Sequence, residues 1–278
     1  GAMGKVYRAW DSKGRNFVAL KVVDTEYYTS KECERRFRRE IEALRRITHR
    51  NVVQIFSHGK SRRGIYFTME FVDGQSLMKL LENGPISPRQ AALFMAQLAD
   101  GLATVHEAGV LHRDIKPTNI LIDSSGTPKL VDFGLASFTD ADTTQTGAGN
   151  IVGTHAFVPP ELFDGEKSDE QSDLYQLGLV LYEMVSGVRA LGKPDIGALI
   201  TGRAFDNLKP IEEVMPTLDF ELADIISSLL ERSPEKRMAS AAMLRDKLVD
   251  WLEKRSLPCP PRRRYESGKW KVLEAAGN

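Results

Sequence analysis

Six polar or charged residues stand between two apolar arms in the stretch GVLHRDIKPTNILI, residues 109–122. These residues are His112, Arg113, Asp114, Lys116, Thr118 and Asn119. Burying so many polar groups costs free energy unless they pair with one another or with a ligand. The stretch is therefore a candidate for a site that holds a ligand.

Two further motifs complete a pattern around this cluster. An Asp-Phe-Gly triplet begins at Asp132, thirteen residues after Asn119, and Lys21 stands ninety-three residues before Asp114 in a Val-Ala-Leu-Lys run. Either motif alone is a weak signal, because a turn after a strand often contains Asp-x-Gly. Together they match the signature set of the protein kinases. The chain resembles the Ser/Thr protein kinases, and among them the bacterial Hanks-type members, from its first residue to about residue 255.

The resemblance implies a role for each polar residue of the cluster. Phosphoryl transfer from ATP places negative charge on a few oxygens, so catalysis is mainly positioning and electrostatic stabilisation. Lys21 would hold the α- and β-phosphates, and Glu40 would pair with this lysine, although Glu42 lies nearby. Asp114 would orient the substrate hydroxyl and accept its proton. Lys116 would contact the γ-phosphate.

ATP and Mg²⁺, or Mn²⁺ in its place, are the cofactors that the resemblance implies. Magnesium prefers hard oxygen ligands, and the matching positions are Asn119 and Asp132. The residues matched to nucleotide contacts are Gly1, Gly4, Val6, Ala19, Lys21, Met69, Glu70, Val72, Leu121 and Asp132. Met69 would be the gatekeeper, and Glu70 to Val72 the hinge that binds adenine. The glycine-loop pattern GxGxxGxV is incomplete, because the chain begins at its second glycine, Gly1; we expect an N-terminally truncated loop.

Supporting positions of the family are also present. The residues matched to structural roles are Phe133, Gly134, Thr154, Glu161, Asp173 and Arg237. Glu161 is expected to form a buried ion pair with Arg237, and Asp173 to accept hydrogen bonds from the catalytic-loop backbone. The residues expected in a hydrophobic spine between the lobes are Phe133, His112, Leu44 and Ile55.

Residues 137–150, SFTDADTTQTGAGN, are polar and rich in threonine. A segment of this kind gains little from burial and is predicted to be a mobile activation loop. The TQT triplet resembles the paired autophosphorylation threonines of bacterial relatives, so Thr144 and Thr146 are predicted phosphosites. Phosphate on this loop would pair with Arg113 and with arginines of the 31–46 helix. The alternative for that arginine run is a solvated helix face.

Composition narrows the classes of partner and compartment. The chain has 278 residues, 38 Lys plus Arg and 38 Asp plus Glu, so its formal net charge is zero. We therefore expect protein substrates and no nucleic acid. Cys33 and Cys259 are far apart, which suits a reducing compartment, and no apolar run is long enough to span a bilayer. We expect a cytoplasmic location, either alone or as part of a longer, membrane-tethered protein.

The elements expected to carry these residues change in type along the chain. Strands are predicted at residues 5–24, around a turn at 12–14, and at 51–59 and 64–72; helices are predicted at 31–48, 88–107, 174–185, 221–231 and 240–254. The fold class is α+β, the bilobal kinase fold with a small antiparallel β lobe carrying one helix and a larger helical lobe. Its expected parts are residues 1–71, residues 72–255, and a Pro/Arg-rich tail or linker at 256–278.

Two classes of function follow from these observations. The first is a Ser/Thr protein kinase that phosphorylates proteins, its own activation loop included, with dimerisation as an open route to phosphorylation in trans. The alternative is a pseudokinase that serves as a nucleotide-binding or scaffolding module. Lys21, Asp114, Asn119 and Asp132 are all present, which favours the kinase. A small-molecule phosphotransferase and tyrosine specificity are both disfavoured by Lys116 and Thr154.

Overall fold

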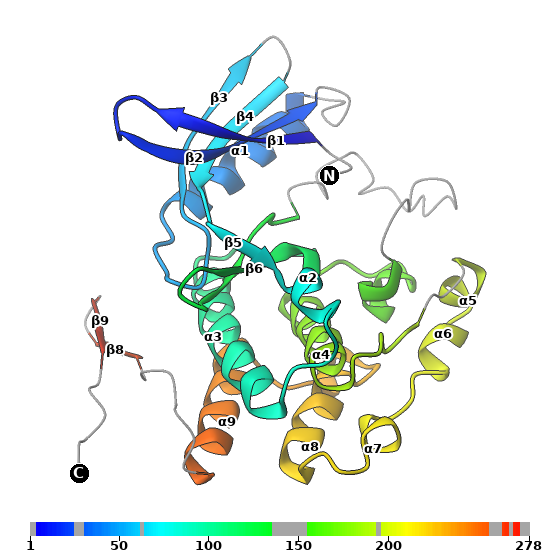
Figure 1. Ribbon diagram of the computed structural model, residues 1–278. Coiled ribbons are helices and arrows are strands. Elements are labelled where there is room, and N and C mark those ends of the chain that lie inside the picture. The colour runs from blue at the N-terminus through cyan, green and yellow to red at the C-terminus, as the bar shows by residue number, and fades with distance from the viewer. Residues whose placement is uncertain are drawn as a thin grey trace, which may run out of the picture.

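A sheet with one helix lies above a larger helical lobe in the computed structural model (Figure 1). The structure describes residues 4–24, 31–61, 64–134, 155–192, 196–255, 263–266 and 269–272. The strands of the first sheet are β1 (Gly4–Asp11), β2 (Asn16–Asp24), β3 (Ile55–Ser61) and β4 (Gly64–Glu70), all antiparallel in the order β1-β2-β4-β3. The sheet and helix confirm the α+β lobe expected at the start of the chain.

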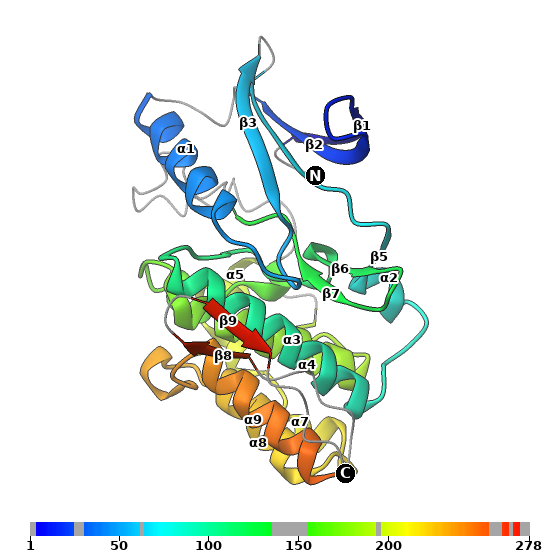
Figure 2. The ribbon, with the colours of Figure 1, turned by 90° about the vertical axis from the view of Figure 1, so that its left-hand side faces the viewer.

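Helix α1 (Lys31–Arg45) lies beside this sheet, as Figure 2 shows. Its predicted apolar face is buried, with Phe37, Ile41 and Leu44 each 2% exposed or less. The ring of Phe37 lies 6.4 Å from that of Phe67 on β4. Apolar residues at a helical spacing thus fix which face of α1 meets the sheet.

The strand register places the nucleotide-binding candidates on one face of the sheet. Lys21 pairs with Val6 on one side and with Phe67 on the other, while Ala19 pairs with Met69. Directly opposed residues of neighbouring strands share a face, and residues two apart on a strand do as well. Lys21, Ala19 and Met69 therefore share the face on which α1 packs.

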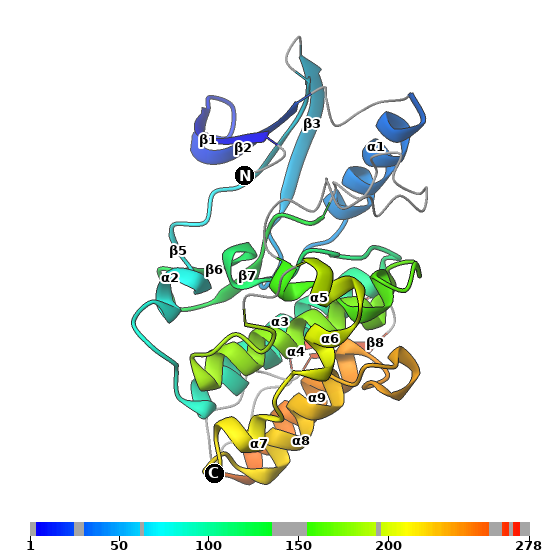
Figure 3. The ribbon, with the colours of Figure 1, turned by 90° about the vertical axis from the view of Figure 1, so that its right-hand side faces the viewer.

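The larger lobe is built mainly of helices. They are α2 (Leu77–Leu81), α3 (Pro88–Glu107), α4 (Glu170–Ser186), α5 (Ile196–Ile200), α6 (Arg203–Asp206), α7 (Ile211–Val214), α8 (Phe220–Leu229) and α9 (Ala241–Lys254). Helices α5 to α7 lie on the side away from α3 and α9 (Figures 1 and 3). No helix among the described residues combines the length and the apolar composition needed to cross a bilayer.

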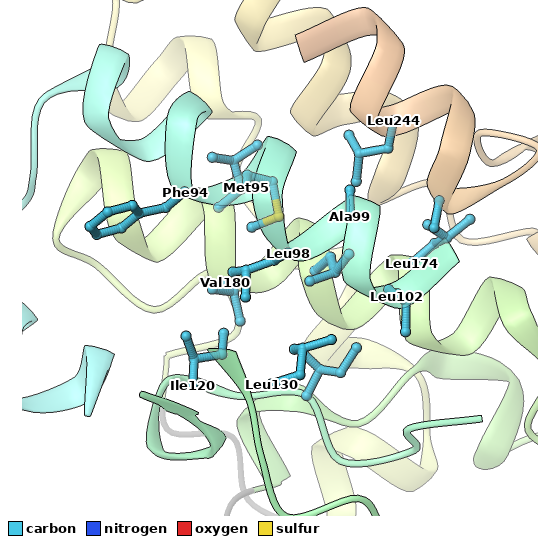
Figure 4. Close-up of a cluster of buried hydrophobic side chains, with 14 of the residues drawn as sticks. Phe94, Met95, Leu98, Ala99, Leu102, Ile120, Leu130, Leu174, Val180 and Leu244 are labelled. Atoms are coloured by element: carbon cyan, nitrogen blue, oxygen red, sulfur yellow. The ribbon is translucent and has the colours of Figure 1, made fainter. Parts of the chain in front are cut away.

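The core of this lobe lies directly beneath a small second sheet. That sheet consists of β5 (Gly74–Ser76), β6 (Ile120–Asp123) and β7 (Pro128–Leu130). Figure 4 shows Leu98 and Leu102 of α3 between Ile120 and Leu130 of the sheet and residues of α4 and α9. All four side chains are fully buried, so the hairpin β6–β7 is anchored on the helices.

The hairpin brings two loops together. The catalytic-loop candidate precedes β6, and the Asp-Phe-Gly triplet follows β7. The amide of Val131 donates to the carbonyl of Asn119 at 3.0 Å, which joins the two loops at their roots. The hairpin therefore brings Asn119 of the catalytic loop close to the Asp-Phe-Gly triplet, which begins thirteen residues later at Asp132.

One sequence expectation needs revision. The strand expected from residue 51 begins only at Ile55. Residues before it pair with the other lobe instead: the amide of Leu130 donates to the carbonyl of Asn51 at 2.8 Å, and the amide of Val53 donates to the carbonyl of Leu130 at 2.9 Å. The segment expected to be a tail or linker includes a two-stranded hairpin, β8 (Arg263–Glu266) with β9 (Lys269–Val272), and its role as tail or linker stays a prediction.

Candidate active site

Asp114 is held by its neighbours in the catalytic loop. The side-chain nitrogen of Asn119, Nδ2, donates to the backbone carbonyl of Asp114 at 2.8 Å and to its carboxylate Oδ2 at 2.7 Å. The ammonium of Lys116 lies 2.8 Å from the other carboxylate oxygen, Oδ1. The Asp114 side chain is 44% exposed, so a carboxylate with a fixed orientation faces solvent, where a substrate hydroxyl could reach it.

The backbone of this loop is fixed from below by Asp173 in the first turn of α4. Its carboxylate is fully buried and accepts hydrogen bonds from the amides of His112 at 2.8 Å and Arg113 at 2.7 Å. His106 of α3 lies 2.9 Å from the same carboxylate. The expectation that Asp173 binds the catalytic-loop backbone is confirmed.

His112 lies in the hydrophobic core and joins the two loops. Its Nδ1 accepts from the amide of Asp114 at 3.4 Å, so its Nε2 donates to the carbonyl of Val131 at 3.1 Å. Burial lowers the pKa of His112, more strongly than the nearby carboxylates raise it. The neutral ring packs on Phe133 with centroids 4.5 Å apart. Phe133, Leu44 and Ile55 all belong to the buried core cluster, and their role as a spine with His112 stays a prediction.

The Asp-Phe-Gly triplet approaches the catalytic loop closely. The amide of Gly134 donates to the carbonyl of His112 at 2.6 Å. A Cβ at position 134 would lie 2.9 Å from that carbonyl oxygen, so only glycine fits without a shift of the backbone. Asp132 has a φ of 55°, in the left-handed region that non-glycine residues seldom adopt. Its carboxylate thereby meets Lys21, with Oδ1 2.9 Å from Nζ.

Glu40 of α1 does not pair with Lys21 as expected. Its Oε1 instead accepts a hydrogen bond from Arg113 at 2.7 Å, and its buried Oε2 has no hydrogen-bond partner among the described residues. Burial raises the pKa of Glu40 to about 7, against the lowering effect of Arg113 and with a further increase from Asp173. In this conformation Glu40 pairs with Arg113, and Lys21 pairs with Asp132. The catalytic role of Glu40 stays a prediction.

The residues matched to adenine contacts lie on the shared sheet face and at the connection between the lobes. Ala19 and Met69 are buried, whereas Val6 is 50% exposed. Val72 and Leu121 are partly buried against the core cluster. The side chain of Glu70 pairs with Lys129, at 2.8 Å, and its backbone amide donates to the carbonyl of Gln54 at 2.9 Å. Gly4 begins β1, where a Cβ would lie 2.1 Å from the carbonyl oxygen of Val22.

Asn119 and Asp132 fit a magnesium ion by their chemistry. Because the Asn119 nitrogen donates twice to Asp114, its Oδ1 is left with one long contact, 3.5 Å from the Thr118 hydroxyl. Within the described ranges no group of three His, Cys, Asp or Glu side chains forms a metal site. Magnesium in phosphate-transfer sites is bound by one or two protein oxygens together with phosphates and water, so this pair of oxygen donors suffices.

The predicted ion pair between Glu161 and Arg237 is formed and buried. The guanidinium donates to both carboxylate oxygens, at 2.9 Å and 2.7 Å. Burial would raise the pKa of Glu161, but hydrogen bonds from Arg237 and Ser172 outweigh it and leave the pKa lowered. The pair ties the short helix Pro160–Leu162 to the segment before α9.

Four sequence-matched positions lie outside the described residues. They are Gly1, Thr144, Thr146 and Thr154. Their roles stay predictions.

One buried residue of the site was missed by the sequence interpretation. Gln176 of α4 contacts the catalytic loop through both ends of its side-chain amide. The available signal was its position in LYQLGLVLYEMV, where a single amide interrupts an apolar helix. Buried amides in such a setting are hydrogen-bonded, which marks the residue as one with a partner to be found.

Comparison with known proteins gives consistent matches. The protein kinase domain family matches residues 1–249. The chain is 35% identical over 257 residues to serine/threonine-protein kinase pkn2 of Myxococcus xanthus, covering 90% of this chain and 31% of that protein. It is 32% identical over 259 residues to serine/threonine-protein kinase PknL of Mycobacterium tuberculosis, covering 93% and 65%. The chain thus spans less than two thirds of the length of these relatives.

Solved structures agree on the fold. A crystal structure of Rad53 in complex with AMP-PNP superposes with a TM-score of 0.73 at 25% identity, covering 89% of this chain and 62% of that chain. A mutant kinase domain of PknI from Mycobacterium tuberculosis has a TM-score of 0.70 at 24% identity, covering 90% and 91%. Because the sequence identity to PknI is only 24%, this second similarity supports the fold alone.

Proposed function

Because the chain belongs to the protein kinase domain family, we propose that it transfers the γ-phosphate of ATP to serine or threonine hydroxyls of proteins. The observation that carries this proposal is the hydrogen bond by which the Asn119 side chain orients the Asp114 carboxylate. Lys21 on strand β2 supports it, because its ammonium binds the carboxylate of Asp132 in the Asp-Phe-Gly loop. The relatives named above are serine/threonine-protein kinases, and the Rad53 structure contains an ATP analogue.

The proposed reaction uses Asp114 as the group that receives the substrate. Its exposed carboxylate accepts the hydroxyl proton as that oxygen attacks the γ-phosphorus and the bond from phosphorus to the β-phosphate oxygen breaks. General-base catalysis of this kind contributes about 10² to 10⁴ in rate. Lys116, whose ammonium is 2.8 Å from Asp114, is proposed to leave this carboxylate and bind a γ-phosphate oxygen.

Lys21, Asn119 and Asp132 are proposed to bind the triphosphate end of ATP with its cation. A bound Mg²⁺ neutralises charge on the phosphates during transfer; Mn²⁺ has the same oxygen preference and is the alternative. For Lys21 to reach a phosphate, its hydrogen bond to Asp132 must be replaced, which also frees the Asp132 carboxylate for the cation.

Protein substrates, among them the chain itself, are the proposed partners. The predicted autophosphorylation sites are Thr144 and Thr146, and dimerisation would allow phosphorylation in trans. Arg113 is the candidate to bind a loop phosphate, and such an event would compete with its present ion pair to Glu40.

Phosphopeptide mass spectrometry after incubation with ATP and Mg²⁺ tests this function, with Asp114→Asn as the matched control. Phosphate on threonines of the wild type alone would support an active, self-phosphorylating kinase. Phosphate on neither protein, together with no transfer to a generic basic or acidic protein substrate, would contradict the proposal. Phosphate elsewhere, with Thr144 and Thr146 unmodified, would keep the enzyme and reject these two sites.

A further inference from the structure

Gln176 occupies a buried position on α4, directly beneath the catalytic loop. The residue is only 4% exposed. Its Oε1 accepts a hydrogen bond from the amide of Ile115 at 2.9 Å, and its Nε2 donates to the carbonyls of Arg113 at 3.3 Å and Phe157 at 3.1 Å. Both amide protons are therefore used, and they join two segments that lie forty-four residues apart.

The partners of Gln176 define the orientation of its side chain. A backbone amide can only donate and a backbone carbonyl can only accept, so the oxygen must face Ile115 and the nitrogen must face Arg113 and Phe157. A carboxylate at this position could not donate to the two carbonyls. An apolar side chain of the same length would remove the hydrogen bonds that Gln176 makes to one backbone amide and two backbone carbonyls, which costs free energy.

Asp114 lies between two residues that Gln176 binds. Asp173, one helical turn before Gln176, binds the amides of His112 and Arg113. Residues three apart on a helix are neighbours on one face, so α4 presents two side chains that together hold the backbone on both sides of Asp114. Asp173 fixes the entry to this segment, and Gln176 fixes its exit at Ile115.

The third hydrogen bond of Gln176 reaches the region that follows the Asp-Phe-Gly triplet. Phe157 ends the short helix His155–Phe157 and is 3% exposed. It lies three residues before Pro160, which opens the helix carrying Glu161. Gln176 thus connects the segment of the catalytic base to the segment that Glu161 and Arg237 anchor.

We propose that Gln176 is a positioning residue that aligns Asp114 with the anchored end of the 155–162 segment. This role rests on the proposed kinase function, because it concerns the placement of the base relative to a protein substrate. Gln176 touches no reacting atom and acts through the backbone of Arg113, Ile115 and Phe157. Misplacing a reacting group by about 1 Å lowers the rate about 100-fold, so a small shift of this loop is enough for a large kinetic effect.

The test compares Gln176→Met with Tyr182→Phe. Methionine has nearly the length of glutamine and is unbranched and flexible, but it cannot replace the three hydrogen bonds. Tyr182→Phe removes one partly buried hydrogen bond of the same helix, from the hydroxyl to the carbonyl of Lys209, far from Asp114 in the chain. It therefore controls for general weakening of α4.

Steady-state kinetics with a peptide substrate should separate the two variants. For Gln176→Met we expect kcat to fall about 10- to 100-fold, the KM for the peptide to rise, and the KM for ATP to stay within about twofold. Tyr182→Phe should keep kcat within about twofold of wild type. A Gln176→Met variant with wild-type kcat, or an equal loss in both variants, would overturn the proposal.

Amide hydrogen exchange gives a readout that does not require activity. The amide of Ile115 should lose protection in Gln176→Met, whereas the amide of His112, held by Asp173, should keep it. Unchanged protection of Ile115 would overturn the proposal even if the wild type transferred no phosphate. If the methionine variant does not fold, Gln176→Ser takes its place, because the smaller polar side chain leaves room for water.

Discussion

Arg113 donates to the carboxylate of Glu40 at 2.7 Å, although Arg113 directly precedes the proposed base Asp114. The pair links α1 of the sheet lobe to the catalytic loop of the helical lobe. At the same time Lys21 donates to Asp132 at 2.9 Å. Glu40 and Lys21 thus have different partners, so the expected pair between them can form only if both of these contacts break.

The first prediction concerns the pH dependence that Glu40 gives to stability. Its pKa is about 7 in the folded protein, above its ordinary 4.5, because burial disfavours the charged carboxylate. Between these values the folded state binds more protons than the unfolded state, so stability falls as pH rises. Relative to Glu40→Gln, the wild type should lose about 3 kcal/mol of unfolding free energy as the pH rises through this range.

Urea unfolding at several pH values measures this difference. The free energy of unfolding of Glu40→Gln should depend less on pH than that of the wild type, with the two curves diverging as pH rises toward 7. Glu107→Gln, at the exposed end of α3, is the control and should follow the wild type. Parallel curves for wild type and Glu40→Gln would contradict a buried carboxyl with a raised pKa.

The second prediction concerns Lys21. Lys21→Met removes the cation that faces Asp132 on the nucleotide side of the sheet. Because a preorganised charge in a desolvated site contributes strongly to transition-state stabilisation, kcat/KM for ATP should fall at least about 100-fold. Lys5→Met, on the neighbouring strand β1, should retain most of the activity because its side chain is exposed. A methionine variant with near-normal kinetics would mean that another cation binds the phosphates.

Elements with a clear period were predictable from sequence, and so was the ion pair of Glu161 with Arg237, whereas the partners of Glu40 and Lys21 were not. Helix α3 has the predicted bounds, 88–107, because its apolar spacing follows the helical period and Ser87 caps it by accepting from the amide of Gln90. The strand expected from residue 51 begins only at Ile55. The residues before it pair with β7 instead, and an apolar run in the sequence does not distinguish a strand of one sheet from an extended segment that pairs elsewhere.

The partner of Glu40 illustrates what sequence patterns leave open. Lys21 and Arg113 are both cations, and spacing along the chain carries no information on which of them α1 approaches. That choice depends on the placement of one lobe against the other. Gln176 is a different case, because its amide was visible in an apolar helix while its three partners come from distant segments.

The third prediction concerns the proposed base. Asp114→Asn keeps the size of the side chain but cannot accept a proton from a substrate hydroxyl, so kcat should fall by about 10² to 10⁴. The KM for ATP should change little, because Lys21 and Asp132 are untouched. Asp206→Asn, an exposed carboxylate paired with Arg232, is the control and should show normal turnover. Equal activity of Asp114→Asn and wild type would reject Asp114 as the base.

The last prediction concerns the buried pair of Glu161 and Arg237. Arg237→Met leaves the Glu161 carboxylate buried without its cation and removes hydrogen bonds to three backbone carbonyls. Breaking one side of a buried pair costs about 3 to 5 kcal/mol of unfolding free energy. The variant should therefore unfold at much lower urea concentration than the wild type.

An exposed ion pair supplies the matched comparison. Lys254→Met breaks a surface contact to Glu221, which should cost far less, because solvent screens an exposed ion pair. The lowered pKa of Glu161 adds a second criterion: its stabilising contribution is present above the ordinary carboxyl pKa of 4.5 and is lost as the pH falls through the lower folded value. In Arg237→Met, the free energy of unfolding should not show this decrease at acidic pH. A cost for Arg237→Met no larger than that for Lys254→Met would show that the buried pair fixes geometry without stabilising the fold.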